Sequence, residues 1–484
     1  MNKFYLTTAI PYVNAKPHVG HALEFVQADV IKRYRKIQGD EVLLLSGADE
    51  NAIKNVQAAE KDGVEVQKFI DIHSKEFEEL AKKLNIELDV FQRGSSTQHH
   101  RASQKLWELC KHDIYKKTYT GLYCVGCELF YEKTELNENG ECFEHPGKRL
   151  DEVSEENYFF KLSKYQKQIE KLIESESLKI YPEFRKNEVL GFLKEGLKDI
   201  SISRSNERAK NWGVKVPNDD TQRMYVWFDA LNIYQSGVGF GSNDKEYKKW
   251  WPADLHVIGK GIIRFHAVYW PAFLLSAGLS VPKALFVHGY FTVDGQKMSK
   301  SLGNVIDPIT LADKYGEDAL RYYFLRELSP FSDGDFSTKR LEEVYNADLA
   351  NGLGNLVSRV SKLCETSRFK QTPNTKNGHV IVEKEQYDKL FSNYQFNEVI
   401  ALVWGKITKL DQYINTEKPW ELLKQPEGSK KLENIEEILS HAVSQIQEIA
   451  ILLSPFLPKT SEKILEQFTK EEVKSKAGLF PRIA

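Results

Sequence analysis

The feature that most constrains the fold is an alternation of strand, helix and strand within the first fifty residues. Residues 4–10 (FYLTTAI) form a short apolar run rich in β-formers, and apolar residues at three- and four-residue spacing predict a helix over 18–38. The run EVLLLSG predicts a buried strand that ends at Gly47. Strands joined through a helix pair in parallel, and parallel sheets bind ligands beyond the carboxyl ends of their strands. We therefore expect one crevice formed by residues 11–17, the start of the following helix and Asp49.

The rest of the sequence changes character twice. Residues 113–220 contain clustered cysteines and short mixed elements, which indicates an inserted domain. Strand patterns resume in MYVWFDA, LHVIGKG and ALFVHGYFTV, and from about residue 339 apolar residues recur at helical spacing. We therefore expect an α/β fold with a doubly wound parallel sheet in two halves, 1–112 and 221–338, an insert over 113–220, and an α-helical domain over 339–484.

Composition limits the kind of partner. The chain has 67 Lys+Arg and 69 Asp+Glu among 484 residues, so a surface that grips nucleic acid everywhere is excluded and only local patches could do so. The first residues are predicted to form a strand rather than a signal peptide, and no apolar stretch reaches the length of a bilayer. Five cysteines are too few for a disulfide scaffold. We expect a cytoplasmic protein that contacts neither membrane nor DNA.

The stretch PHVGH favours anion binding at the start of the predicted helix. His18 and His21 are three residues apart and share one helix face, where backbone N–H groups point outward. Gly20 between them lets a ligand approach the backbone. Two imidazoles at a helix N-terminus could hold phosphate. Two surface histidines, or half of a metal site, remain open alternatives on these residues alone.

The stretch DGQKMSKSLGN places two lysines on a predicted loop. Asp294-Gly295 is a strong turn signal, and Lys297 and Lys300 follow it among small residues. Lysine is a compact charge on a long, flexible stem, so the pair could close over phosphates as charge develops in a transition state. The alternative is a solvated loop with no such role.

The clustered cysteines have the spacing of a tetrahedral zinc site. Cys124 and Cys127 form one C-x2-C pair, and Cys142 and His145 form a C-x2-H pair. Four protein ligands leave no open position, so the predicted role is structural. Free cysteines are the alternative, while the tight spacing and the expected reducing setting disfavour disulfides.

HVGH and KMSKS together resemble the signature pair of class I aminoacyl-tRNA synthetases. The stretches TTAIPYVNAKPHVGHALE, YVWFDALNIY and HVIGKGIIRFHAVYWPA are more specifically similar to methionyl-tRNA synthetases, and the similarity covers essentially the whole chain. The resemblance implies a Rossmann-like catalytic domain, a connective insert with one zinc knuckle and an anticodon-binding bundle. It also implies ATP-dependent activation of L-methionine and its transfer to tRNA(Met), with Mg²⁺ accompanying ATP and one structural Zn²⁺.

The same resemblance assigns roles to individual residues. The ATP-binding residues would be His18, Gly20, His21, Glu24, Lys297 and Lys300. Four of them, His18, His21, Lys297 and Lys300, would also act in catalysis. Methionine would be bound by Ile10, Tyr12, Asp49, Trp227, Leu231, Tyr234, Ile262 and His266. The anticodon would be read by Asn355, Arg359 and Trp420. A carboxylate suits an α-ammonium group, aromatic rings suit a thioether, and a Trp beside Arg and Asn suits unstacked bases. Without the resemblance, the aromatic residues would be assigned to core packing.

The chain departs from the family at two places. GADENA stands where GTDEHG is expected, so that Asn51 and Ala52 replace a His and a Gly, and Gly261 replaces an Asp.

Three other functions compete with the interpretation as a methionine enzyme. A synthetase for Ile, Leu or Val would need a larger insert, a nucleotidyltransferase would leave the helical domain unexplained, and a zinc-containing RNA-binding module would leave both phosphate motifs without a role. No appended dimerisation module is visible, so a monomer is expected.

Overall fold

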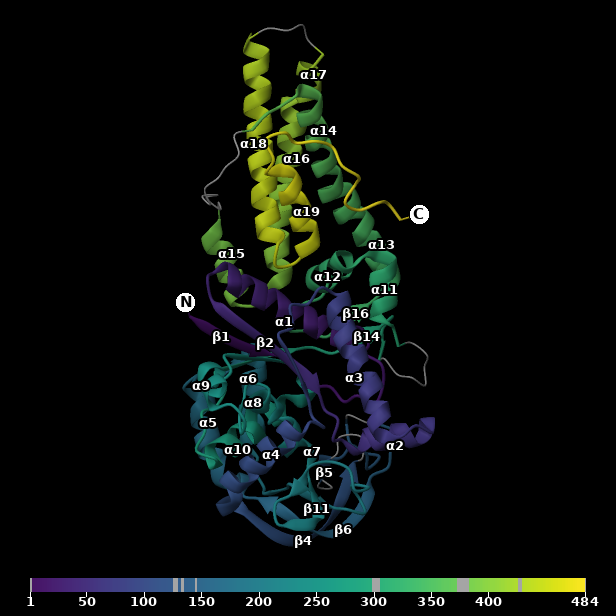
Figure 1. The fold of residues 1–484 in the computed structure, drawn as a ribbon, viewed down its shortest axis with the longest axis vertical. Coiled ribbons are helices and arrows are strands. Elements are labelled where there is room, and N and C mark those ends of the chain that lie inside the picture. Colours follow the sequence, from purple (N-terminus) through teal and green to yellow (C-terminus); the bar gives the residue numbers. More distant parts are fainter. Residues whose placement is uncertain are drawn as a thin grey trace. The chain divides into compact units, whose positions relative to one another are not determined.

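The computed structural model describes residues 2–124, 129–131, 135–143, 146–297, 305–371, 383–424 and 429–483. The chain forms two compact units, each assembled from separated segments (Figure 1). The first unit contains Met1–Pro17, Arg35–Lys82 and Ile86–His288, and the second contains His18–Tyr34, Lys83–Asn85 and Gly289–Ala484. The HVGH stretch therefore belongs to the second unit and the strands that flank it in sequence belong to the first.

The first unit is built on one parallel sheet of six strands. Strand β1 (Lys3–Thr7) pairs with β2 on one side and with β12 on the other, and all pairings in the sheet are parallel. The strand order is β3 (Val90–Arg93), β2 (Glu41–Ala48), β1, β12 (Leu255–Gly259), β13 (Ala284–His288) and β7 (Lys179–Tyr181). Strand order reverses beside β1, which is the point where parallel sheets of this kind bind ligands. The predicted α/β fold is confirmed.

Helices of the first unit contribute several of its buried aromatic residues, such as Trp107, Trp227 and Trp270. These helices include α2 (Ile53–Asp62), α3 (Val66–Lys83), α4 (Thr97–Cys110), α5 (Gln166–Glu174), α6 (Glu183–Lys194), α7 (Val226–Ala230), α8 (Ile233–Ser236), α9 (Asp244–Trp250) and α10 (Trp270–Ser276). Ser96 caps α4 by accepting a hydrogen bond from the His99 N–H, which satisfies a backbone donor that helix geometry leaves open. A π-helical turn, Phe265–Tyr269, leads into α10. Such turns occur mostly as single-turn bulges inside helices and are frequent at functional sites.

Two small antiparallel sheets occupy much of the segment predicted to be an insert. One contains β4 (Ile114–Cys124), β5 (Leu129–Tyr131), β6 (Asp151–Phe160) and β8 (Ile200–Ser201). The other contains β9 (Ser203–Ser205), β10 (Lys215–Val216) and β11 (Asp219–Met224). Strand β7 also lies between residues 113 and 220, yet it forms an edge of the parallel sheet by pairing with β13. The segment therefore contributes to the main sheet as well as to its own sheets.

Helix α1 (Val19–Ile37) confirms the helix predicted over 18–38. Pro17 precedes it, and Gly39, with φ of 89°, follows it in a conformation that favours glycine. Its residues as far as Tyr34 belong to the second unit.

The long C-terminal segment of the second unit, from Gly289, begins with a short hairpin. Strand β14 (Phe291–Val293) pairs with β15 (Gln296–Lys297) and with β16 (Gly334–Phe336). The predicted turn is confirmed, since Asp294 and Gly295 have φ of 49° and 76°. The single strand predicted over ALFVHGYFTV is wrong, because β13 and β14 lie in different sheets. A side chain at Gly289 between them would meet the Ser332 carbonyl at 2.2 Å.

The rest of the second unit is helical, as predicted (Figure 1). Its helices are α11 (Pro308–Tyr315), α12 (Glu317–Arg326), α13 (Thr338–Val344), α14 (Asn355–Ser367), α15 (Lys384–Ser392), α16 (Phe396–Glu417), α17 (Pro419–Leu422), α18 (Ser429–Leu453) and α19 (Pro458–Phe468). Their buried faces include apolar residues such as Val399, Leu439 and Ile464. None of the helices in the described part of the chain is long and apolar enough to cross a bilayer.

Candidate active site

The residues assigned to methionine come together at the carboxyl ends of three neighbouring strands. Ile10 and Tyr12 follow β1, Asp49 follows β2, and Ile262 and His266 follow β12. Tyr12 and Asp49 form a parallel bridge, in which the Asp49 N–H donates to the Pro11 carbonyl at 2.8 Å. Asp49 is 3% exposed. A buried carboxylate at the switch point of a parallel sheet is suited to a cationic group of a small ligand.

An aromatic wall stands over these strand ends. Trp227 on α7 stacks on Phe265, with ring centroids 3.7 Å apart and planes 5° apart. Tyr12 and His266 both meet Trp227 edge-on, at 6.4 and 6.3 Å between centroids. Leu231 is buried in the same apolar core, against which Ile10 also packs. Phe265 was missed by the sequence analysis, and its position one residue before His266 is the only signal that could have indicated it.

Tyr234 and His266 form a hydrogen bond whose direction follows from its surroundings. Tyr234 Oη lies 2.8 Å from His266 Nε2, and His266 Nδ1 lies 2.9 Å from the Ile262 carbonyl oxygen. A carbonyl only accepts, so Nδ1 carries the proton and the Tyr234 hydroxyl donates to Nε2. Burial lowers the pKa of His266 to about 4, which keeps the ring neutral at pH 7. The pocket therefore presents a neutral imidazole.

A second buried histidine supports this pair and was not identified from the sequence. His256, on β12, lies with its ring centroid 4.3 Å from that of Tyr234, and its Nδ1 is 2.7 Å from Thr7 Oγ1. Burial, and secondarily His266, lowers the pKa of His256 well below its usual value. The only sequence signal for His256 is that a polar residue occurs within a predicted apolar strand.

In the second unit, the two histidines of HVGH lie against each other at the start of α1. Their ring centroids are 3.9 Å apart, with planes at 30°. The Gly20 N–H donates to His18 Nδ1 at 3.1 Å and the His18 N–H donates to His21 Nδ1 at 3.2 Å. Both Nδ1 atoms therefore accept, so each neutral ring carries its proton on Nε2. Burial lowers the pKa of His18 to about 4, so His18 is a neutral donor at pH 7.

The remaining residues assigned to ATP are only partly described. Glu24 lies on α1 and is largely buried. Lys297 ends β15, where it pairs with Thr292, so the prediction that it lies on a loop is wrong for its main chain. Lys300 lies outside the described residues.

Half of the predicted zinc ligand set is described. Cys124 Sγ and Cys142 Sγ are 3.2 Å apart, and both side chains are buried. This separation is well beyond the roughly 2.0 Å of a disulfide, and both sulfurs could reach one ion at about 2.3 Å. Cys127 and His145 lie outside the described residues. The two described sulfurs are therefore close enough to share one ion, and no group of three or more potential ligands occurs among the residues that the structure describes.

Two of the three residues assigned to the anticodon lie together in the helical unit. The Arg359 guanidinium on α14 lies over the Trp420 ring on α17, 5.6 Å from the centroid. Arg359 is held there by Asp411 at 2.6 Å and Asn415 at 2.8 Å. Asn355 is exposed one turn earlier on α14. A cation held against an aromatic ring forms a platform suited to stacking bases.

The chain matches the models of two known protein families. Residues 4–361 match the family model described as tRNA synthetases class I (M), and residues 383–483 match the anticodon-binding domain of tRNA ligase. The methionine–tRNA ligase of Thermotoga maritima is 40% identical over 99% of this chain and 77% of its own length. That of Nostoc is 41% identical over 96% of this chain and 89% of its own length.

The fold also matches a solved structure. Methionyl-tRNA synthetase from Mycobacterium tuberculosis in complex with methionyl-adenylate superposes with a TM-score of 0.93 at 35% identity, covering 100% of both chains. Its ligand-free form gives a TM-score of 0.84 at 32% identity, covering 100% of this chain and 99% of the other. The chain belongs to the methionine type of class I tRNA synthetases.

Proposed function

We propose that the chain activates L-methionine with ATP, giving methionyl-adenylate and pyrophosphate, and transfers the methionyl group to the 3′ terminal adenosine of tRNA(Met). The observation that carries this proposal is the pocket at the strand ends, where a buried carboxylate, stacked aromatic rings and a neutral histidine lie together. Relatives named methionine–tRNA ligase and a structure with methionyl-adenylate support the same reaction. The product supplies translation initiation and elongation.

The pocket chemistry fits methionine. Asp49 offers a carboxylate to the α-ammonium group, and Trp227 with Phe265 offers a polarisable wall to the thioether. His266 is neutral, so no charge has to be desolvated when an apolar side chain enters. Tyr234 is fixed by its hydrogen bond to His266. Methionine has an α-ammonium group for the carboxylate, a sulfur for the aromatic wall and an apolar side chain that suits the neutral histidine.

The first step needs positioning rather than a protein nucleophile. A methionine carboxylate oxygen attacks the α-phosphorus of ATP in line, the bond to the bridging oxygen breaks, and pyrophosphate leaves. Negative charge on the phosphate oxygens must be stabilised as this happens. We assign His18 and His21 to that task, because each presents an Nε2–H donor at the first turn of a helix. Gly20 admits the ligand to the backbone, and Glu24 is assigned to the ribose.

Lysine charges complete the proposed ATP site. We assign Lys297 and Lys300 to the phosphates, with Lys300 contributing most in the transition state. The support is the KMSKS sequence and the turn at Asp294-Gly295 that precedes it. Mg²⁺ accompanies ATP and neutralises phosphate charge.

We propose one structural zinc held by Cys124, Cys127, Cys142 and His145. The short separation of the two described sulfurs and the spacing of the four residues support it. The metal would fix the connective insert of residues 113–220. Cysteine thiolates as ligands suit a reducing, cytoplasmic setting.

The helical unit is proposed to bind the anticodon through Asn355, Arg359 and Trp420. The contact between Arg359 and Trp420 supports this assignment. We propose that the chain divides into catalytic halves at 1–112 and 221–338, a connective insert at 113–220 and an anticodon-binding domain at 339–484, and that it acts as a monomer.

The decisive experiment is amino-acid-dependent ATP–pyrophosphate exchange without tRNA, using a panel of amino acids. Exchange with methionine alone is expected. Exchange driven by another amino acid would keep the class of enzyme and overturn the pocket assignment. Isoleucine, leucine and valine belong in the panel, because their synthetases share both signature motifs.

A further inference from the structure

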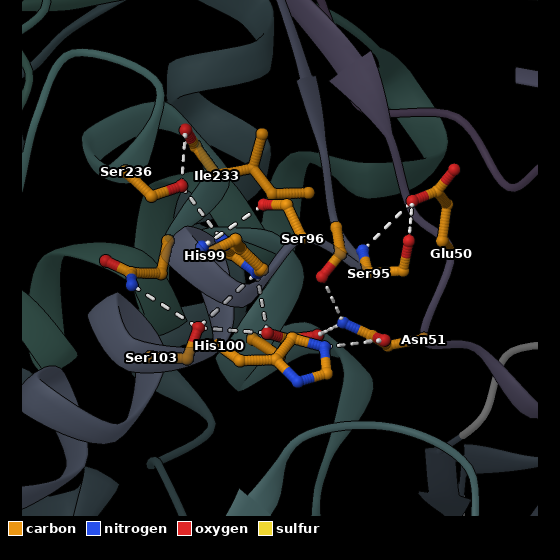
Figure 2. Close-up of polar contacts among 12 residues, drawn as sticks. Glu50, Asn51, Ser95, Ser96, His99, His100, Ser103, Ile233 and Ser236 are labelled. Carbon is orange, nitrogen blue, oxygen red and sulfur yellow. Dashed lines mark hydrogen bonds and ion pairs between the residues drawn. The ribbon is translucent and has the colours of Figure 1, made fainter. Parts of the chain in front are cut away.

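A buried carboxylate that no assigned role uses lies beside the methionine pocket. Asp229 is 1% exposed and sits on α7, two residues after Trp227. Its Oδ1 accepts from His99 Nε2 at 2.7 Å and from Ser103 Oγ at 2.9 Å, both on α4 (Figure 2). Burial raises the pKa of Asp229, but the combined lowering by His99, His100 and Asn51 is larger. The pKa of Asp229 therefore lies below its ordinary value. The carboxylate is therefore ionised and needs every donor around it.

Asn51 supplies the remaining contact to this carboxylate. Its Nδ2 donates to Asp229 Oδ2 at 2.7 Å and to the Gly94 carbonyl at 2.8 Å (Figure 2). Both partners only accept, which fixes the orientation of the amide. Its Oδ1 lies 3.3 Å from His100 Nε2, which must donate. One neutral side chain thus satisfies two acceptors and one donor.

The segment that carries Asn51 is anchored independently of Asn51. Glu50 is fully buried and accepts from Ser95 N at 2.9 Å, from Ser95 Oγ at 2.6 Å and from Ser74 Oγ at 2.5 Å. Arg93 also forms an ion pair with Glu50. A change at position 51 therefore leaves the segment attached to the fold and alters mainly its distance from α7.

We infer that Asn51 is a positioning residue for methionine, because its amide fixes the ammonium-binding carboxylate of Asp49 relative to the aromatic wall of Trp227. Asp49 precedes Asn51 by two residues, and Trp227 precedes Asp229 by two. The hydrogen bond between Asn51 and Asp229 is thus a direct link between the two sides of the pocket. The inference rests on the proposed function, and it assigns a role to a position at which this chain departs from the family pattern.

The test exchanges the amide for a carboxylate of the same shape. In Asn51→Asp, two carboxylates would lie in contact, and they could share a hydrogen bond only when one of them holds a proton. Methionine-dependent exchange is expected to show a KM for methionine raised about tenfold or more at pH 8, since a buried donor is replaced by a like charge. The increase should shrink toward pH 6, where the pair binds a proton, and the KM for ATP should stay near the wild-type value.

Several titratable groups surround position 51, so further variants are needed to interpret the pH dependence of Asn51→Asp. His99 and His100 face it from α4, Asp229 faces it from α7, and Asp49 and Glu50 lie on its own segment. Asn51→Leu adds no titrating group, so it should raise the KM for methionine without the pH dependence of Asn51→Asp. Asn243→Asp is the matched control, because it adds the same charge in the same unit where Asn243 caps α9 and an aspartate caps equally well.

The outcomes separate this inference from the proposed function. Wild-type exchange with methionine, together with Asn51 variants whose KM for methionine is unchanged, would overturn only the inference. So would an equal rise in both KM values, or identical pH profiles for Asn51→Asp and Asn51→Leu. Wild-type protein that shows no methionine-dependent exchange would overturn the proposed function and the inference with it. Melting temperatures of all variants establish that the compared proteins are folded.

Discussion

Arg321 and Asp29 form an ion pair in which neither side chain is exposed to solvent. Arg321 Nη2 lies 2.7 Å from Asp29 Oδ2. The same guanidinium donates to the carbonyls of Phe456, Pro455 and Leu84 at 2.8, 2.9 and 3.2 Å. Asp29 lies on α1 and Arg321 on α12, so one side chain joins both helices to the segment before α19. Because His18 and His21 stand at the start of α1, the helical unit holds the helix that carries them.

Arg321→Lys should destabilise the protein strongly. Lysine offers a single point charge and cannot reproduce the planar set of donors that four acceptors require. Breaking a buried pair typically costs about 3–5 kcal/mol. Because lysine keeps the positive charge beside Asp29, the expected loss in the free energy of unfolding is smaller, about 2–4 kcal/mol. Denaturant unfolding measures it. Arg340→Lys, at an exposed pair with Glu327, is the control, expected to change by less than about 1 kcal/mol. Equal stabilities of the two variants would contradict the prediction.

Local periodicity was sufficient to predict the first strand, helix and strand, because each is long and regular in its pattern. It could not predict β7, since three residues, KIY, carry no periodic signal and their partner β13 is about a hundred residues away. The same limit applies to ALFVHGYFTV, whose second half, β14, pairs with the distant strand β16 and does not continue β13. Pairings between distant segments are fixed by packing that a local pattern does not record.

Parts of the candidate site could be proposed from the sequence where they are written as contiguous motifs. HVGH, KMSKS and the cysteine spacing could be recognised directly, whereas the pocket residues were assigned only through the family resemblance. Phe265, His256 and Asp229 were missed because each matters through a neighbour distant in sequence: Trp227, Thr7 and Asn51 respectively. The motif departure at Asn51 was visible in the sequence, but its partner Asp229 was not.

Acid should destabilise the pocket through His266. Its pKa is about 4 in the folded protein and near the ordinary 6.5 when unfolded. The unfolded chain therefore binds the proton first, so the stability contributed by the neutral ring is complete above about pH 6.5 and is lost as pH falls toward 4. The loss approaches about 3 kcal/mol. His266→Gln should show a shallower decline in the free energy of unfolding over this window. His441→Gln, at an exposed position, is the control and should decline as the wild type does. Parallel declines for His266→Gln and wild type would contradict this.

Lys300→Ala should lower the rate of adenylate formation far more than it raises the KM for methionine. A charge that acts mainly on the transition state changes kcat and kcat/KM together. Loss of one such stabilising group commonly costs about 100-fold or more. Pre-steady-state adenylation measures the effect, with Lys339→Ala, at an exposed lysine of the same unit, as the control. An unchanged kcat would remove Lys300 from the proposed role.

Freshly purified protein should contain about one zinc per chain, since one ligand set is present. Cys124→Ser should lose the metal, because a serine oxygen is a poor replacement for a thiolate. Cys110→Ser tests a buried cysteine outside the set, whose sulfur contacts the Phe273 carbonyl, and should retain the metal. Elemental analysis of the three proteins decides the question. Metal-free wild-type protein, or equal zinc in both variants, would exclude the site.

Trp420→Ala should impair tRNA charging and leave methionine activation intact. The Trp420 ring lies against Arg359, which Asp411 and Asn415 hold in place, so the platform is formed before a base arrives. Stacking of a base on an aromatic ring contributes about 1–3 kcal/mol, which corresponds to a KM for tRNA raised about 5-fold to more than 100-fold. Trp404→Phe, at a ring packed on Tyr322 within the bundle, controls for general disturbance of the helices. Aminoacylation and ATP–pyrophosphate exchange should be measured side by side. A loss of exchange equal to the loss of charging would show that Trp420 supports the fold rather than the anticodon, because only a structural role would affect the reaction that needs no tRNA.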